Sequence, residues 1–230
     1  MSESARLLRL LQLTDSGFPT GAFAFSHGLE GLVSSGFVQS ERDVEQFIIA
    51  QLREGFGGIE CPAMAHAWRA SRQANVDALL EIDTLVDALK PVPVFKSGSV
   101  RTGRRLLESA SGLLAGPMLA DLRMAVRSGK TSGHHAVAFG VVMESAGQDL
   151  ETASLALGAG FVNGLGAAAV RLGVIGQVAA QRIVGRSSNA IDAVAARGRG
   201  MALEEMGSYL PMIDVAGLRH PLLAGRVFAS

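Results

Sequence analysis

The chain has 230 residues, of which 48% are hydrophobic and 18% are charged, so a sizeable core can form and wholesale disorder is not expected. The 21 basic and 21 acidic residues give no formal net charge, which argues against a dedicated nucleic-acid-binding protein, because such proteins rely mainly on phosphate neutralisation. Cys61 is the single cysteine and no export signal is visible, so we expect a cytoplasmic protein without an internal disulfide.

The chain is expected to open with a short helix, Ser4–Leu13, followed by a sharp elbow. The elbow is predicted because Asp15-Ser16-Gly17 and Pro19-Thr20-Gly21 combine glycines, which permit positive φ, with a proline that lacks an N–H. After Gly21 the apolar residues again have helical spacing and share one face. These residues are Phe25, Leu29, Leu32 and Val33. A second helix is therefore predicted to run from the elbow to about Gly36.

Three further helices are predicted in the next segment. Ser40 and Asp43 have the spacing of a capping box, and the apolar face that follows them is expected to end at Gly57-Gly58. Pro62 suits the first turn of a fourth helix that runs to about Gln73. Asn75 is expected to cap a fifth helix, which the prolines of Pro91-Val-Pro93 must interrupt.

Residues 94–103 form a polar, glycine-containing and basic stretch that is predicted to be a solvated loop leading into a helix. Its cations and those that follow are Lys96, Arg101, Arg104 and Arg105. A contact patch for another molecule is the alternative to a solvated loop.

The second half of the chain is predicted to be helical as well. The expected helices are Pro117–Arg127, His134–Ala146, Leu150–Val170, Gly173–Val184 and Asn189–Met206. No segment alternates β-branched and polar residues with period two. The fold predicted for residues 1–230 is therefore an all-α, single-domain bundle of about ten helices.

The uncharged stretch Thr152–Val170 is long enough to cross a membrane in principle. It consists mostly of alanine and glycine, which contribute little transfer free energy. We expect a buried helix that its neighbours approach closely through Gly160 and Gly164.

No chemical motif in the sequence assembles an active site. Gly129-Lys130-Thr131 resembles part of a phosphate-binding loop but lacks the first glycine of that motif, where Met124 stands. His27 and Glu30 are spaced as neighbours on a helix and are expected to form a polar surface pair, with a helical hydrolase as the alternative.

The histidines and Cys61 do not have the spacing of a structural metal site. Isolated surface histidines are therefore expected, and no metal ligands are predicted. The residues considered are His27, Cys61, His66, His134, His135 and His220. A nickel-binding metallochaperone that uses His134 and His135 remains an alternative.

Three blocks of the chain carry a family resemblance. The run Leu-Gln-Leu-x-Asp-Ser-x-Phe-Pro-x-Gly-x-Phe-x-x-Ser-x-Gly-Leu-Glu, which ends at Glu30, resembles the N-terminal signature of the UreF family of urease accessory proteins. A second block carries Arg171, Leu172, Gly176, Gln177 and Gln181. The last block is Arg219-His220 followed by Arg226-Val-Phe228-Ala-Ser230. A weaker similarity covers residues 99–107.

Two departures from the family pattern affect the expectations. Phe23 stands where the family often has tyrosine, and Val174 stands where proline is common, so a continuous helix across residues 173–175 is expected. From the residues alone, the tail over residues 209–230 can be a structural cap or a segment ordered by a partner. The resemblance favours the partner, and it implies that the elbow packs near residues 226–230.

The resemblance implies a non-enzymatic scaffold without a cofactor of its own, acting in the insertion of nickel into urease. The implied partners are the UreD (UreH) accessory protein, the nickel-carrying GTPase UreG, apo-urease and a second copy of the chain, with no membrane or nucleic acid. The residues that the resemblance assigns to partner binding are Phe23, Ser26, Gly28, Leu29, Glu30, Arg171, Gln177, Arg226 and Phe228.

Overall fold

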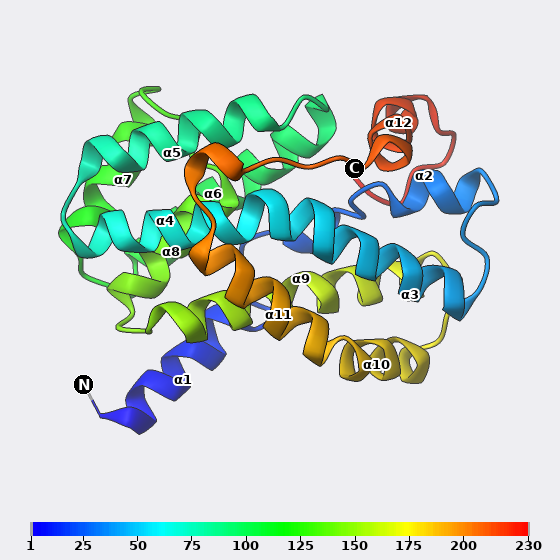
Figure 1. The fold of residues 1–230 in the computed structure, drawn as a ribbon, viewed down its shortest axis with the longest axis horizontal. Coiled ribbons are helices and arrows are strands. Elements are labelled where there is room, and N and C mark those ends of the chain that lie inside the picture. The colour runs from blue at the N-terminus through cyan, green and yellow to red at the C-terminus, as the bar shows by residue number, and fades with distance from the viewer. Residues whose placement is uncertain (1, 230) are drawn as a thin grey trace.

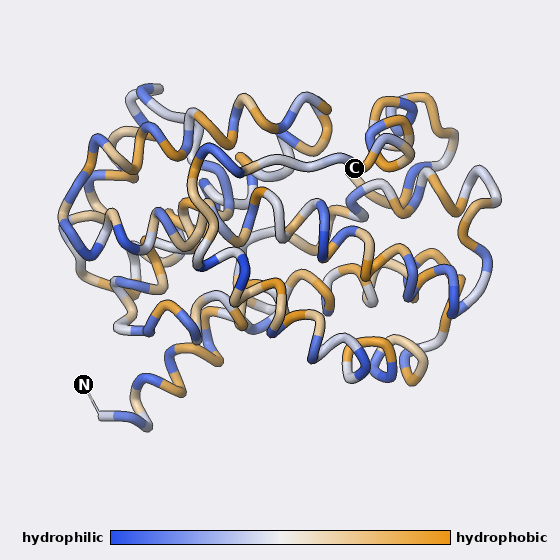
Figure 2. The backbone as a smooth tube through the Cα atoms, viewed as in Figure 1, coloured by the Kyte–Doolittle hydropathy of each residue, from blue (hydrophilic) through white to orange (hydrophobic). Residues whose placement is uncertain are grey.

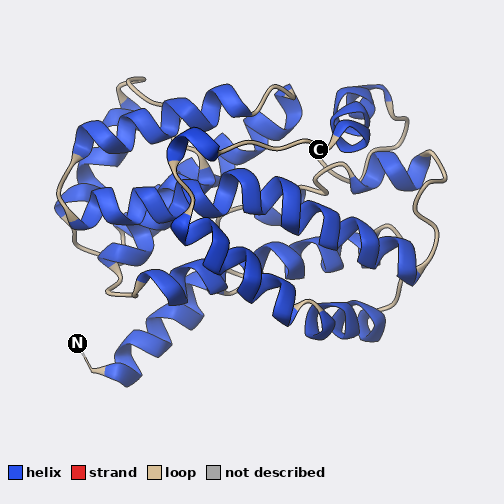
Figure 3. Ribbon diagram, in the orientation of Figure 1, coloured by secondary structure: helices blue, strands red, loops and turns tan. Residues whose placement is uncertain are grey.

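The computed structural model describes residues 2–229, and all regular secondary structure within that range is helical (Figures 1 and 3). The first helices are α1 (Glu3–Thr14), α2 (Leu29–Ser34), α3 (Glu41–Ala50), α4 (Cys61–Arg72), α5 (Val76–Leu89) and α6 (Pro93–Ser111). The others are α7 (Pro117–Arg127), α8 (His135–Ser145), α9 (Leu150–Arg171), α10 (Gln177–Arg186), α11 (Ser188–Gly200) and α12 (Pro211–Arg219). A π-helix spans Gln51–Glu60, and short 3-10 turns occupy Ala22–Ala24, Leu203–Glu205 and His220–Leu222. The predicted all-α single-domain bundle is confirmed.

Helix α8 lies at the centre of the bundle against α4. Its residues from Ala136 to Met143 are all buried, as expected for a helix that is apolar on every side. A Cβ atom on Gly140 would lie only 2.5 Å from the carbonyl oxygen of Met64. The glycine therefore allows the two helix backbones to approach closely.

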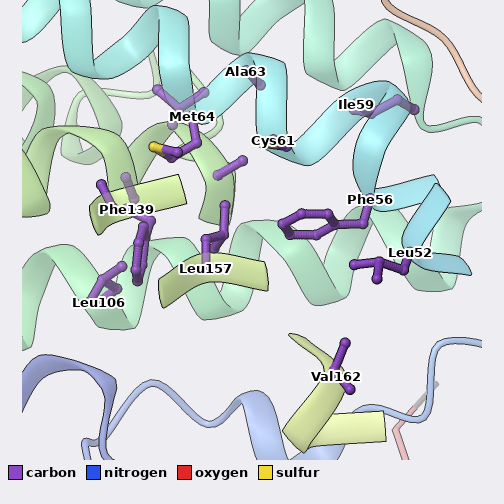
Figure 4. Close-up of a cluster of buried hydrophobic side chains, with 14 of the residues drawn as sticks. Leu52, Phe56, Ile59, Cys61, Ala63, Met64, Leu106, Phe139, Leu157 and Val162 are labelled. Carbon is purple, nitrogen blue, oxygen red and sulfur yellow. The ribbon is translucent and has the colours of Figure 1, made fainter. Parts of the chain in front are cut away.

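The core continues from α4 and α8 to α9. Figure 4 shows Leu52 and Phe56 of the π-helix above Val162 of α9, with Leu157 of α9 to one side of Phe56, while the ring of Phe56 stacks on Phe161 at 5.1 Å. Fully burying a side chain of this size stabilises the fold by roughly 1.5–3 kcal/mol. Helix α1 contrasts with this core, because hydrophobic and hydrophilic residues alternate along it (Figure 2) and only Leu13 of its residues is buried.

Two predictions about glycines were wrong because the glycines mark close contacts rather than breaks. Gly57-Gly58 does not end the third helix, which continues through the π-helix into α4. A Cβ on Gly57 would lie 2.8 Å from Cγ1 of Val194, and one on Gly58 would collide with the carbonyl oxygen of Gly207. The Gly207 N–H also donates to the Gly58 oxygen at 3.0 Å.

Residues 94–103 are likewise not a loop but the first half of α6, which begins at Pro93. A Cβ on Gly98 would lie 2.8 Å from Cε1 of Phe25, and one on Gly103 would collide with the carbonyl oxygen of Gly133. These glycines make room for neighbouring segments. The polar composition reflects one exposed helix face.

The chain does break between α9 and α10, so the expected continuous helix across residues 173–175 was wrong. Gly173 has φ 73°, and the N–H of Val174 donates to the Ala169 oxygen at 3.1 Å, which is a Schellman ending. Helix α10 starts only at Gln177, and α11 ends at Gly200 rather than at Met206. Other helix ends were predicted correctly, including the capping box of Ser40 and Asp43.

Helix α9 is long and apolar enough to cross a membrane by length and composition, but half of its most apolar window is buried inside the fold. It packs against α10, α11 and α4, as a core helix of a soluble protein does. The predicted close approach through Gly160 and Gly164 was wrong, because both are exposed with open space at the Cβ position. Gly158 makes that approach instead, with Cγ2 of Ile191 2.9 Å from a Cβ placed there.

Candidate functional site

The elbow between α1 and α2 comprises residues 15–28 and is not helical over most of its length. Gly21, His27 and Gly28 have positive φ angles of 72°, 52° and 88°. These angles are incompatible with a continuous right-handed helix, so the predicted helix from Gly21 onward was wrong and α2 starts only at Leu29. The predicted helical pairing of His27 with Glu30 is lost for the same reason.

The side chain of Glu30 is the centre of the site and is only 8% exposed. Its Oε1 accepts the Val227 N–H at 2.6 Å, and its Oε2 accepts the Phe228 N–H at 3.2 Å. Nε2 of His220 lies 2.8 Å from Oε2. Burial of a carboxylate is costly unless it is hydrogen-bonded, so Glu30 and the C-terminal tail stabilise each other.

Arg171, the last residue of α9, joins the elbow to the tail. Its guanidinium carbon lies 5.1 Å from the ring centre of Phe23 and 4.2 Å from that of Phe228. Its Nη1 donates to the Phe23 oxygen at 2.5 Å, and its Nη2 lies 3.5 Å from the Val227 oxygen. One side chain therefore contacts residues from both ends of the sequence.

The predicted packing of the elbow against the tail is confirmed as far as residue 229, since the Ala229 N–H also donates to the Ala24 oxygen at 2.8 Å. Ser230, the last residue of the predicted block, lies outside the described residues. The single chain already packs this tail on its body, and α12 lies beside α2 (Figure 1). Whether a partner orders the tail stays a prediction.

The remaining predicted site residues divide by burial. Ser26 and Leu29 are fully buried, and Ser26 accepts the Glu30 N–H at 3.3 Å. Gly28 lies against Ile213 and Phe95, where a Cβ would be 3.1 and 3.4 Å from their side chains. These residues, with Glu30 and Phe228, can shape the surface but are covered in this conformation. The predicted residues exposed to a partner are Phe23, Arg171, Gln177 and Arg226.

Gln177 lies in the exposed first turn of α10. None of the hydrogen bonds or ring contacts among residues 2–229 joins its side chain to the elbow. Its predicted role in the same site therefore rests on the resemblance alone.

A second buried carboxylate, Asp83 of α5, holds the segment before α8. Its side chain accepts the Thr131 hydroxyl at 2.6 Å and the N–H groups of Gly133 and His134 at 2.8 and 2.7 Å. The hydroxyl that made residues 129–131 resemble a phosphate-binding loop is thus bonded within the core.

The expectation of isolated surface histidines was wrong. His134 is fully buried, with Nδ1 3.1 Å from Oγ of Ser99 and Nε2 3.2 Å from Oδ1 of Asp87, and His220 is buried on Glu30. Nε2 of His66 lies 2.9 Å from the Met201 oxygen. His134 and His220 are buried by contacts with distant segments of the chain, which helical spacing alone does not reveal.

Burial also shifts the pKa values of two further histidines and of the cysteine. It lowers the pKa of His27 and of His135 to about 4, with Glu60 opposing the shift in both, and raises the pKa of the Cys61 thiol to about 12. At neutral pH these imidazoles and the thiol are therefore uncharged. Within the described part of the chain, no group of three or more His, Cys, Asp or Glu residues is arranged to hold a metal ion.

Sequence reasoning weighed His220 only as a metal ligand and did not single out Asp83. His220 stands in the Arg219-His220 motif of the last block, which was the only signal that pointed to it. Asp83 is one of several acidic residues on α5, and its partners lie about fifty positions further along the chain.

Comparisons of the sequence with a family model and with curated proteins all identify UreF. The family model of UreF matches residues 38–188. A urease accessory protein UreF from Trichodesmium erythraeum is 35% identical over 229 residues, covering 100% of this chain and 99% of the relative. Relatives of the same name from Arthrobacter sp. and Xanthobacter autotrophicus are each 32% identical, over 97% of this chain and 96% and 91% of their own lengths.

Proposed function

Because the chain belongs to the UreF family of urease accessory proteins, we propose that it is a non-enzymatic scaffold in the insertion of nickel into urease. In this role it bridges UreD (UreH)-bound apo-urease and the nickel-carrying GTPase UreG, and it modulates that GTPase. It works in the cytoplasm as a homodimer and has no cofactor of its own. Nickel is the cargo of the assembly.

The observation that carries this proposal is the junction of elbow and tail. Three blocks that are far apart in the sequence meet around Glu30 and Arg171, through hydrogen bonds to Val227 and Phe228 and ring contacts to Phe23. The junction offers an exposed aromatic ring and exposed guanidinium groups, which suit recognition of a protein surface.

The alternatives receive less support from the geometry. For a hydrolase, Glu30 is committed to the tail, and its hydrogen bonds among residues 2–229 do not include His27. For a nickel-storing chaperone, His134 is buried between Ser99 and Asp87, and burial keeps the pKa of His135 low.

Co-expression with tagged UreD tests the proposal. We expect Arg226→Ala, or truncation before Arg219, to abolish co-purification with UreD while the far-ultraviolet circular dichroism spectrum stays helical. Arg53→Ala, which changes an exposed arginine on the π-helix, serves as the matched control and should co-purify normally. Retention of UreD by both tail variants would contradict the assignment of the tail.

A further inference from the structure

Helix α6 presents a basic face beside the elbow. Arg101, Arg104 and Arg105 are all exposed and follow the i, i+3, i+4 spacing that places side chains on one side of a helix. In a loop these side chains would point in unrelated directions. The helix instead gathers three guanidinium groups within little more than one turn.

These arginines are held by packing and by neutral groups. The guanidinium carbon of Arg101 lies 4.7 Å from the ring centre of Phe25, which is itself only 6% exposed. Nε of Arg104 donates to the Ser132 oxygen at 2.9 Å. The guanidinium of Arg105 occupies the space beside Gly21 into which a side chain at that position would extend.

Within residues 2–229, none of the three has a carboxylate within ion-pair distance. The nearby carboxylate of Glu108 is already engaged by Arg127 at 2.7 and 2.9 Å. The arginines of α10 differ, since Arg182 and Arg186 pair with glutamates of α3 at 2.7–3.1 Å. In a chain of zero formal net charge, the face of α6 therefore carries a local positive excess.

A shallow surface depression adjoins this face. It is lined by Pro19, Gly21, Arg104, Arg105, Glu108 and Ser109. Guanidinium groups that are already fixed by packing lose little rotamer entropy when they bind carboxylates in a bidentate manner. Because Glu108 is already paired with Arg127, the unpaired guanidinium groups beside the depression favour a negatively charged ligand.

We propose that Arg101, Arg104 and Arg105 form a docking surface for an acidic segment of a protein partner. The proposal rests on the scaffold function for the identity of that partner, which is a member of the urease-assembly complex. An acidic protein fits better than a nucleic acid, because Phe25 is covered by Arg101 and offers no face for base stacking.

The test compares three double variants with the unmodified chain. Arg101→Glu/Arg105→Glu reverses the charge, Arg101→Lys/Arg105→Lys retains it, and Arg42→Glu/Arg53→Glu makes the same charge change at exposed arginines of α3 and the π-helix. Each immobilised chain is exposed to a polyglutamate peptide, to a polyuridylate oligomer and to the UreD–apo-urease complex. Binding is measured by biolayer interferometry at about 50 and about 500 mM sodium chloride, on either side of physiological screening.

We expect the charge reversal on α6 to weaken binding of polyglutamate and of the complex by about tenfold or more at low salt, and by much less at high salt. The lysine variant should stay closer to the unmodified chain, and the α3 control should change by less than about twofold. Equal weakening by both charge reversals would overturn the proposal, as would preferential binding of polyuridylate that depends on α6. If polyglutamate binds as expected but the complex does not bind the unmodified chain, the scaffold function fails while the acidic docking surface stands.

Discussion

Two buried carboxylates in this molecule bind the backbone of a distant segment, and the segments differ in how firmly they are attached. Asp83 holds residues 131–134, which lie between α7 and α8 and include the fully buried His134. Glu30 holds residues 227 and 228, in a segment without helical structure that follows the 3-10 turn His220–Leu222. The first segment leads directly into the buried helix α8, whereas the second lies at the edge of the bundle beside the elbow.

This difference indicates that the same chemistry stabilises the core in one region and fastens a peripheral segment in the other. Local opening costs little where few contacts are buried and the neighbouring backbone is free to move. Leu222 of the tail is 83% exposed, although His220 and Phe228 are buried, while the loop at Asp83 is hydrogen-bonded to both α5 and α6. The predictions below use this contrast, beginning with the largest expected effect.

Asp83→Ala should destabilise the whole fold. The substitution leaves the N–H groups of Gly133 and His134 and the hydroxyl of Thr131 without their acceptor in the interior, at a cost of about 3–5 kcal/mol in the free energy of unfolding. Urea denaturation followed by circular dichroism measures the change. Glu81→Ala, on the exposed face of the same helix, should stay within about 0.5 kcal/mol. A similar loss in both variants would show that Asp83 has no special role.

Glu30→Gln should release the tail while the bundle stays folded. The amide can accept only through one oxygen, so at least one of its tail contacts is lost, at about 1–3 kcal/mol. Hydrogen exchange should show lost protection of the Val227 and Phe228 amides, with protection in α4 and α8 unchanged, and co-purification with UreD should fall. Simultaneous loss of protection in α8 would remove the distinction between the two regions.

The sequence predicted those features that depend on neighbouring residues. The end of α1, which was predicted within one residue of Thr14, follows from the glycines and proline of the elbow, and the Ser40–Asp43 capping box and the Asn75 cap follow from local hydrogen bonding. The glycines of 57, 58, 98 and 103 were misinterpreted because the segments that approach them come from elsewhere in the chain.

The candidate site shows the same limit. Glu30 and Phe228 were both singled out by the family resemblance, but they are 198 positions apart and no local pattern indicates that they are hydrogen-bonded. His220 was not assigned to the site, because a lone histidine in a tail carries no signal of burial. Long-range partners of this kind become visible only in the folded chain.

Acid should weaken the fold through histidines of both regions, because burial also lowers the pKa of His134 in the Asp83 loop. His27 belongs to the elbow and His135 follows the loop held by Asp83, and burial lowers the pKa of each to about 4. Since the unfolded chain has histidine pKa values near 6.5, it binds more protons than the folded chain between about pH 4 and pH 6.5. Stability should therefore fall as the pH decreases through this window, by up to about 1.4 kcal/mol per pH unit for each histidine.

Single substitutions assign the two contributions. His27→Asn, which tolerates the positive φ at this position, and His135→Gln should each reduce the slope of unfolding free energy against pH. His66→Gln is the control, since this histidine lies on α4, outside both regions, with its ring hydrogen-bonded to the Met201 oxygen. A slope that is unchanged in both test variants would mean that other groups cause the acid sensitivity.

Arg171→Lys should give the smallest change in stability. It distinguishes the contribution of ring stacking from that of the positive charge. A lysine keeps the positive charge but cannot stack a planar group on Phe23 and Phe228 while also donating to the Phe23 oxygen. We expect a loss of about 0.5–1 kcal/mol, because cation–π contacts at exposed sites are of that size. Hydrogen exchange at Phe228 should increase, but less than in Glu30→Gln, because the carboxylate still holds the tail. An effect as large as that of Glu30→Gln would show that Arg171 of α9, rather than Glu30, holds the tail. The tail would then not be held by a buried carboxylate as the loop at Asp83 is.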